Sequence, residues 1–311
     1  MTVENKQIDK SSQTVLDALA YVPSKILYHA WTLFLFTKAD IKGVIVPMTL
    51  FAVTSTPLTS LSRLPHVVFW LWLTVLQCDL PNQTLGRIED EKNKSDRPIP
   101  SGRISFEAAV VLRWLILPVC FAVSALYSRE TVYAAIAICA LTYVYNEGGA
   151  AAANWFVRDF VIALMYIAWG SGACLIAGTD RTELTNSARV SLLYCLCVVT
   201  STIHAEDFKD VVGDALVGRK TLPIVAPAFA RYSFPPLIIA WSVFLSMSWK
   251  LPMAAMVAYI ALGTLVGWRF VAYDSIKSDQ RSFYLYSLWL TLGFTLPANV
   301  NLEPMLNRFV A

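Results

Sequence analysis

Apolar residues run along the chain in nine long segments that are separated by polar connections. Each segment is close to the roughly 20 residues that a helix needs to cross a bilayer, and none alternates with the period of two that marks a barrel strand. The pattern therefore predicts an all-α membrane protein with nine transmembrane helices in one bundle over residues 39–311. The predicted helices cover residues 40–58, 66–83, 105–127, 131–147, 155–178, 189–206, 232–249, 252–273 and 283–300. Ser105, with Glu107 two residues later, is the expected start of the third.

Residues 1–38 form a polar lead that ends in a short amphipathic stretch, Ile26 to Phe36. This stretch is too short to span, so we expect it to lie at the membrane interface. The polar residues Met1 to Gln13 are not followed by an apolar core of the signal-peptide type, so no cleavable signal peptide is expected.

Composition strengthens the membrane assignment. Only 15% of the 311 residues are charged and 56% are hydrophobic, whereas a soluble domain carries about a quarter charged residues. A net charge of +3 gives no indication of nucleic-acid binding. The 6 cysteines lack metal-ligand spacing with histidines and are expected to be reduced, buried thiols. The composition sets no oligomeric state.

The connections differ in length and charge. Two long polar ones follow the second and sixth apolar segments, and nine spans place both on the same side as the N-terminus. Most of the 25 lysines and arginines fall on that side. By the positive-inside rule it faces the cytosol, which predicts a multi-pass protein, expected in the endoplasmic reticulum, with its active site facing the cytosol.

The connection after the sixth segment carries three aspartates at i, i+3 and i+7, Asp207, Asp210 and Asp214, which share one face of a helix. Lys209 lies among them, and Gly218 gives a turn before Arg219 and Lys220. Carboxylates beside fixed cations suit a Mg²⁺–phosphate complex, in which oxygen ligands hold the metal and cations hold the spare phosphate oxygens.

The connection after the second segment has a similar mixture. Its oxygen donors and cations are Asn82, Glu89, Asp90, Asn93, Lys94 and Arg97, followed by Arg103. Alone, it could equally be a solvated loop with scattered salt pairs. Together, two acidic clusters on one side of a membrane can hold Mg²⁺ and a diphosphate, and the apolar bundle beneath accepts a hydrocarbon tail. That combination describes a prenyl diphosphate, whose allylic C–O bond ionises to a carbocation when the leaving diphosphate is stabilised.

The layout resembles the UbiA superfamily of intramembrane prenyltransferases over residues from about 38 to 300. The pattern Asp207-x-x-Asp210-x-x-x-Asp214 with Gly218-Arg219-Lys220-Thr221 fits that family well. The first motif departs, because Gln83 and Gly86 stand where two family aspartates would be. This altered form, with Arg-Pro-Ile-Pro-Ser-Gly-Arg after it, is similar to the fungal UbiA-type membrane terpene cyclases, which ionise farnesyl or geranylgeranyl diphosphate and cyclise it.

The resemblance implies a UbiA-like bundle and a role for each candidate residue. The implied Mg²⁺ ligands are Asn82, Asp90, Asn93, Asp207 and Asp214, with Glu89 and Asp210 in support. The implied diphosphate-binding residues are Lys94, Arg97, Lys209, Arg219 and Lys220. The carboxylates that the chemistry depends on are Asp90, Asp207, Asp210 and Asp214.

Several other polar and aromatic residues have two interpretations. Tyr143, Tyr145, Trp155, Tyr166 and Trp169 could present ring faces to a carbocation or could be packing residues. Residues from Asn146 to Asp159, including Glu147 and Arg158, could close one side of the head-group site or form an ordinary turn. His204 could bind metal, although a packed histidine suits Mg²⁺ chemistry better, and Glu206 could join the site. Asp274, Lys277, Asp279 and Arg281 suggest a solvated loop.

Three functions remain after these observations. The altered first motif favours a Mg²⁺-dependent terpene cyclase, acting on geranylgeranyl or farnesyl diphosphate. The same ionisation could instead deliver the prenyl cation to an aromatic acceptor. A lipid-diphosphate transporter is disfavoured, because no ionisable relay crosses the membrane.

Overall fold

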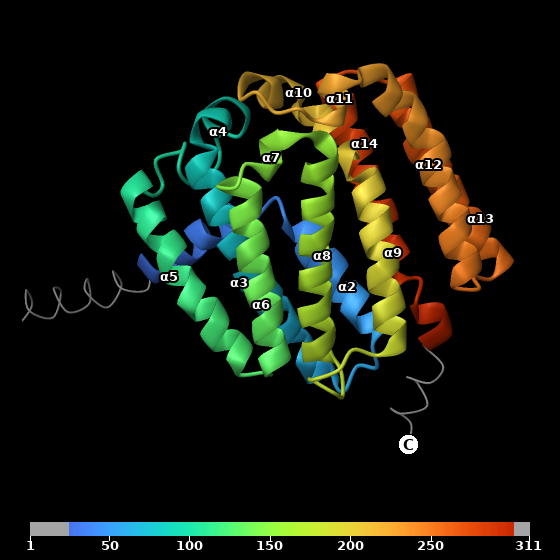
Figure 1. Ribbon diagram of the computed structural model, residues 1–311, viewed down its shortest axis with the longest axis horizontal. Coiled ribbons are helices and arrows are strands. Elements are labelled where there is room, and N and C mark those ends of the chain that lie inside the picture. Colours follow the sequence, from blue (N-terminus) through green and yellow to red (C-terminus); the bar gives the residue numbers. More distant parts are fainter. Residues whose placement is uncertain (1–24, 302–311) are drawn as a thin grey trace, which may run out of the picture.

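The computed structural model describes residues 25–301, and helices account for almost all of their regular structure (Figure 1). Residues 25–37, which include the amphipathic stretch Ile26 to Phe36, are helical, and the interfacial location of this stretch stays a prediction. The described residues contain no strand, only one isolated bridge between Leu58 and Gly178. The interpretation of residues 1–24 as a polar lead without a signal peptide lies outside the described range.

The helices follow one another with short connections. A π-helical turn, η1 (Ile41–Ile45), leads into α2 (Val46–Ser55), and the 3₁₀ turn η2 (Leu61–Arg63) precedes α3 (Leu64–Leu85). The remaining elements are α4 (Arg87–Asn93), α5 (Phe106–Ala125), α6 (Arg129–Asn146), α7 (Ala150–Ala153), α8 (Trp155–Ala177), α9 (Asn186–Thr202), η3 (Ile203–Ala205), α10 (Asp207–Leu216), α11 (Leu222–Val225), α12 (Pro227–Ser248), α13 (Met253–Ala272) and α14 (Ile276–Thr295).

Each of the nine predicted apolar segments falls on one of these helices, but nine membrane spans are not confirmed. Within residues 25–301, 5 helices are long and apolar enough to cross a membrane, namely α5, α8, α9 extended to Ala205, α12 and α13. The first predicted span corresponds to the shorter apolar helix Ile41–Ser55. The all-α multi-helix fold is therefore as predicted, and the count of spans remains a prediction.

The last helix corrects the sequence analysis. It begins at Ile276, seven residues before the predicted start, so Lys277, Asp279 and Arg281 belong to a helix and not to a solvated loop. Ser275 caps it by accepting a hydrogen bond from the Ser278 backbone. Asp279 is only 1% exposed. Hydrophobicity alone missed this turn because its one buried acid is neutralised by an arginine of α12, far away in the sequence.

Capping explains several other helix starts. Ser105 accepts a hydrogen bond from the Ala108 backbone and Glu107 lies in the first turn of α5, as predicted. Asn154 does the same for α8 through the Val157 backbone. This cap fixes where α8 begins, and it places Arg158 in the first turn, at the mouth of the bundle.

The short helices α4 and α10 lie at the same end of the bundle, at the top of Figure 1. The long helices pack closely beneath them. At Gly172 in α8, an added Cβ would overlap the ring of the fully buried Trp70 from α3, so glycine is required for this close approach. The two charged connections are thus held over one apolar body.

Candidate active site

A cavity of about 430 Å³ opens between the two charged connections and the helices below them. Its polar lining comes from both predicted motifs. From the first come Asn82, Glu89, Lys94 and Arg97, and from the second come Lys209, Asp210, Asp214 and Arg219. Its deeper lining is apolar and includes Val75, Met165, Trp169 and Leu290. The structure thus brings together at one cavity the two blocks that the sequence separates by more than a hundred residues.

The second motif is held by arginines. Asp207 and Asp214 lie on α10, on the shared face that their spacing predicts, and each is 1% exposed. Asp207 Oδ1 accepts a hydrogen bond of 2.7 Å from Arg158 Nη2, and Asp214 Oδ1 accepts one of 2.7 Å from Arg219 Nη1. Charge-assisted pairs of this kind fix the orientation of each carboxylate.

Arg219 also joins the two motifs. Its Nη1 lies 2.9 Å from Glu89 Oε2 on α4 and 2.7 Å from Asp214 on α10. These three side chains are largely buried, so the link is desolvated and is not a surface pair. Arg219 therefore sets the position of α4 against α10 at the mouth of the cavity.

Asp90 pairs with a different arginine, Arg97. It is 2% exposed, and both of its oxygens accept from Arg97 Nη1, at 2.7 and 2.8 Å. Asp90 does not line the cavity, whereas Arg97 does. In this arrangement Asp90 orients a cation that faces the cavity.

Two carboxylate oxygens of the second motif have no hydrogen-bond partner among the described residues and are suitable metal ligands. Asp207 Oδ2 and Asp214 Oδ2 are both buried and accept no hydrogen bond from any described residue. No group of three acidic, histidine or cysteine side chains converges on one point within residues 25–301. Mg²⁺ commonly binds through one or two carboxylates, with waters and substrate phosphates completing its shell. The donor set therefore fits Mg²⁺ held jointly with a diphosphate.

The surroundings shift the pKa values of the three aspartates in different directions. Burial, with the negative charges of Asp214 and Glu206, raises the pKa of the Asp207 carboxyl, although Arg158 opposes this. Burial also raises the pKa of Asp214. For Asp210 burial acts in the same direction, but Lys209 and Lys94 outweigh it and lower the pKa. Two of the three carboxylates thus lack full compensation for their charge, as expected of a site that receives a cation.

Four of the predicted site residues do not line the cavity, namely Asp90, Asp207, Lys220 and Tyr143. Lys220 is exposed and does not line it. Tyr143 is 61% exposed on the outside of α6. The side chain of Asn93 lies outside the described part of the chain, so its assignment as a ligand stays a prediction. Asp207 does not line the cavity itself, although its hydrogen-bond partner Arg158 does.

Three of the aromatic candidates do line the cavity, namely Tyr145, Tyr166 and Trp169. The Tyr166 hydroxyl donates a hydrogen bond of 2.6 Å to the Gly43 carbonyl, and Arg158 donates to the Tyr145 hydroxyl. The rings of Tyr166 and Trp169 meet edge to face at 5.9 Å. These contacts fix the rings against the apolar part of the cavity.

For the residues that had two interpretations, the structure shows which ones line the cavity and which do not. Asn146 lines the cavity, but Glu147 pairs with Arg113 instead. Glu206 lines the cavity and pairs with Lys209. His204 is 3% exposed and packs edge-on against Phe234 at 5.5 Å, away from the cavity lining. The packing interpretation of His204 is therefore the one that its surroundings fit.

Several residues that line the cavity were not predicted from the sequence. Asp40 and Asp79 both line it, as do Lys38 and Lys42 at the start of the bundle. The signal for Asp79 was available, because it lies three residues before Asn82 and shares a helix face with it. Asp40 offered no such signal, because only tertiary packing brings it to α3.

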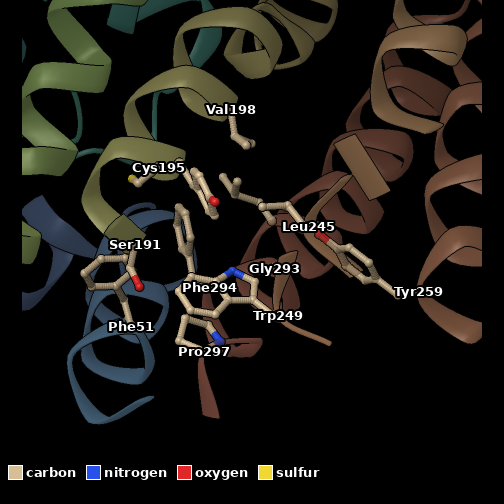
Figure 2. Close-up of a pocket in the computed structure, with 12 residues that line it drawn as sticks. Phe51, Ser191, Cys195, Val198, Leu245, Trp249, Tyr259, Gly293, Phe294 and Pro297 are labelled. Carbon is tan, nitrogen blue, oxygen red and sulfur yellow. The ribbon is translucent and has the colours of Figure 1, made fainter. Parts of the chain in front are cut away.

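A second, much smaller apolar cavity of about 20 Å³ lies toward the other end of the bundle (Figure 2). Figure 2 shows Phe51, Leu245, Trp249 and Phe294 around it. Leu290 of α14 lines both cavities, so this one side chain lies between them.

Both the sequence and the fold match known proteins. Residues 44–291 match the model of the UbiA prenyltransferase family. The chain is 32% identical over 269 residues to fumagillin beta-trans-bergamotene synthase of Aspergillus fumigatus, covering 86% of this chain and 91% of that protein. It is 30% identical to a diterpene cyclase of Hericium erinaceus, over 83% of this chain and 85% of the other. A solved UbiA homolog from Archaeoglobus fulgidus, bound to GPP and Mg²⁺, has the same fold, with a TM-score of 0.64, 17% identity and coverage of 86% of this chain and 99% of that one.

Proposed function

Because the chain belongs to the UbiA prenyltransferase family, we propose that it is an intramembrane, Mg²⁺-dependent terpene cyclase. Its substrate is a free prenyl diphosphate, either geranylgeranyl or farnesyl diphosphate, and its products are a cyclic terpene and diphosphate. One observation carries the proposal. A single cavity joins the carboxylates and cations of both motifs at its mouth to an apolar interior lined by aromatic rings. The relatives named as a synthase and a cyclase support the same reaction class.

The side chains divide the work of this reaction. Lys94, Arg97, Lys209 and Arg219 bind diphosphate oxygens. Asp90, Asp210 and Asp214 orient Arg97, Lys209 and Arg219. The carboxylates of Asp207, Asp210 and Asp214 would hold the metal. Mg²⁺, when bound, neutralises the negative charge that develops on the leaving diphosphate. The allylic C–O bond then breaks, its electron pair leaves with the diphosphate, and a carbocation remains in the cavity.

The apolar interior controls the fate of this carbocation. Tyr145, Tyr166 and Trp169 line the cavity, where aromatic rings stabilise a cation without acting as nucleophiles. An apolar wall limits capture of the cation by water and leaves the substrate's own alkenes to attack. Loss of a proton completes the product. We place this chemistry at the cytosolic face of the endoplasmic reticulum membrane, from the distribution of cationic residues.

The direct test uses microsomes that contain the protein, Mg²⁺ and either farnesyl or geranylgeranyl diphosphate without acceptor. The organic extract is analysed by gas chromatography with mass detection. A cyclic hydrocarbon that disappears with EDTA supports a cyclase and identifies the substrate. Product that forms only after an aromatic acid is added would make the protein a prenyltransferase instead.

Leu290 offers a test of chain-length selection, because it lies between the two cavities. Leu290→Ala is expected to join them and deepen the apolar space. The ratio of turnover on geranylgeranyl to that on farnesyl diphosphate should rise about tenfold, as expected for removing apolar bulk from a specificity pocket. Leu288→Ala, on the exposed side of the same helix, should leave the ratio unchanged. An unaltered ratio in both variants would show that Leu290 does not limit chain length.

A second prediction compares an aromatic residue that lines the cavity with one that does not. Trp169→Leu is expected to alter the product mixture and lower turnover by about tenfold, because the variant loses a ring that faces the cation. Tyr143→Leu, 61% exposed and outside the cavity, should give wild-type products. Product profiles measured by mass spectrometry decide between these outcomes. An altered mixture from Tyr143→Leu alone would reverse the assignment.

A further inference from the structure

Two aspartates outside both predicted motifs line the polar part of the large cavity. Asp40 immediately precedes the π-helical turn η1, and Asp79 lies in α3, about one turn deeper than Asn82 and on the same helix face. They come from different segments of the chain, and only the packing of η1 against α3 brings them together. Neither is explained by ion pairing with a neighbouring cation, since no salt bridge involving either is found among the described residues.

At positions 83, 86 and 90, where the family pattern has aspartates, this chain has no unpaired carboxylate. Gln83 is 1% exposed, and its Nε2 donates a hydrogen bond of 2.8 Å to the Phe36 carbonyl, so it serves the fold. Gly86 has no side chain. Asp90 is occupied on both oxygens by Arg97. A metal that approaches from the first-motif side therefore needs other oxygen donors.

Asp79 supplies such a donor. It is 6% exposed, it lines the cavity, and its Oδ2 is buried without a hydrogen-bond partner in the part of the chain that the structure describes. The carboxyls of Asp79 and Asp40 line the same cavity and act on each other electrostatically. Two neighbouring carboxylates, one buried and one half-buried, repel each other unless a cation or a shared proton lies between them.

The location favours a cation. Lys94 and Arg97, both at the mouth of the cavity, act electrostatically on both carboxyls, so the pair lies at the head-group end and not among the aromatic rings. Asn82 also lines the cavity one turn above Asp79. Two carboxylates and one amide oxygen form an all-oxygen donor set of the kind that Mg²⁺ prefers.

We propose that Asp40 and Asp79, together with the Asn82 amide oxygen, form the first-motif half of the Mg²⁺ site and replace the carboxylates absent at positions 83 and 86. The inference rests on the proposed function, and it concerns which residues hold the metal. The site is displaced about one helical turn deeper than the family pattern. The diphosphate is thereby drawn toward the aromatic part of the cavity.

The test measures metal binding directly. Purified protein in detergent is titrated with Mn²⁺ in the presence of inorganic diphosphate, and free Mn²⁺ is followed by electron paramagnetic resonance. Asp79→Asn and Asp40→Asn are each expected to weaken Mn²⁺ binding by at least about tenfold, since each removes one charged ligand. Asp40→Glu, which keeps a carboxylate at a half-buried position, should retain most of the affinity. The control is Asp274→Asn, an exposed acid that does not line the cavity, which should bind Mn²⁺ as the wild type does.

The outcomes separate the alternatives. Wild-type Mn²⁺ affinity in both Asn variants, with product lost or altered, would overturn the metal assignment and indicate that the pair shares a proton and accepts one from the substrate. If Asp79→Asn does not fold, Asp40→Asn decides alone. A protein that forms no terpene but still loses Mn²⁺ affinity in the variants would keep this inference and overturn the proposed function.

Discussion

Asp207→Asn is expected to lower terpene formation at least about a thousandfold, the largest loss for any single residue of the site. Asp207 Oδ1 is held by Arg158, and Oδ2 is buried without a partner among the described residues, so the second oxygen is the one available to a metal. Asparagine has nearly the same shape but removes the charge. It also places an amide N–H either at Arg158 or at the metal position, and both are unfavourable.

Product is measured by gas chromatography after incubation with the prenyl diphosphate, and Mn²⁺ binding is measured on the same preparation. Both should fall together, because the carboxylate acts through the metal. Asp274→Asn, an exposed acid in the loop before α14, is the control and should behave as wild type. Retention of more than about a tenth of the activity in Asp207→Asn would show that Asp207 only positions Arg158.

The sequence predicted this part of the site because its pattern is local. Spacings of three and seven residues place Asp207, Asp210 and Asp214 on one helix face, whatever the rest of the chain does. The distribution of apolar residues likewise placed every long helix, since a helix in a bundle must present apolar side chains along its length. Helix ends were less accurate. The helix α14 begins with a polar turn that hydrophobicity does not register, and α12 begins at Pro227, five residues before the predicted start.

The partners of these residues could not be predicted, because they depend on contacts between distant helices. Nothing near Asp207 in the sequence selects Arg158, which reaches it from the first turn of α8. The link from Glu89 through Arg219 to Asp214 likewise exists only after α4 and α10 meet. Asp40 escaped notice for the same reason. Residue type and spacing predict the chemistry of a cluster, whereas tertiary packing decides which carboxylates remain free to bind a metal.

Asp279 belongs to a charged stretch that the sequence suggested was a solvated loop, yet its side chain is buried. Its two oxygens accept from Arg231 of α12, at 3.0 and 2.7 Å, and it is 1% exposed. Arg231 also donates to the Phe270 and Tyr273 carbonyls at the end of α13, so one guanidinium ties together α12, α13 and α14. A charge pair of this kind is strongly coupled to the fold, because neither partner can be left alone in the interior.

Asp279→Ala is therefore expected to lower the free energy of unfolding by about 2–3 kcal/mol, since it leaves the Arg231 charge without its counter-ion, and partial exposure of Arg231 keeps the loss below that of a fully buried pair. Unfolding of the purified protein in detergent, followed by circular dichroism, measures this loss. Lys277→Ala, an exposed neighbour in the first turn of the same helix, should change the stability by less than about 0.5 kcal/mol.

The double variant Arg231→Met with Asp279→Leu separates the two possible origins of that loss. If the cost comes from an uncompensated buried charge, removing both charges should recover most of the stability, because a well-packed apolar pair is often as stable as a buried ion pair. If the double variant is instead as unstable as Asp279→Ala, the decisive contribution is the set of hydrogen bonds from Arg231 to the two carbonyls of α13, which methionine cannot make. In that case Arg231→Met alone should be as damaging as the double variant, and the arginine, not the ion pair, holds the last three helices together.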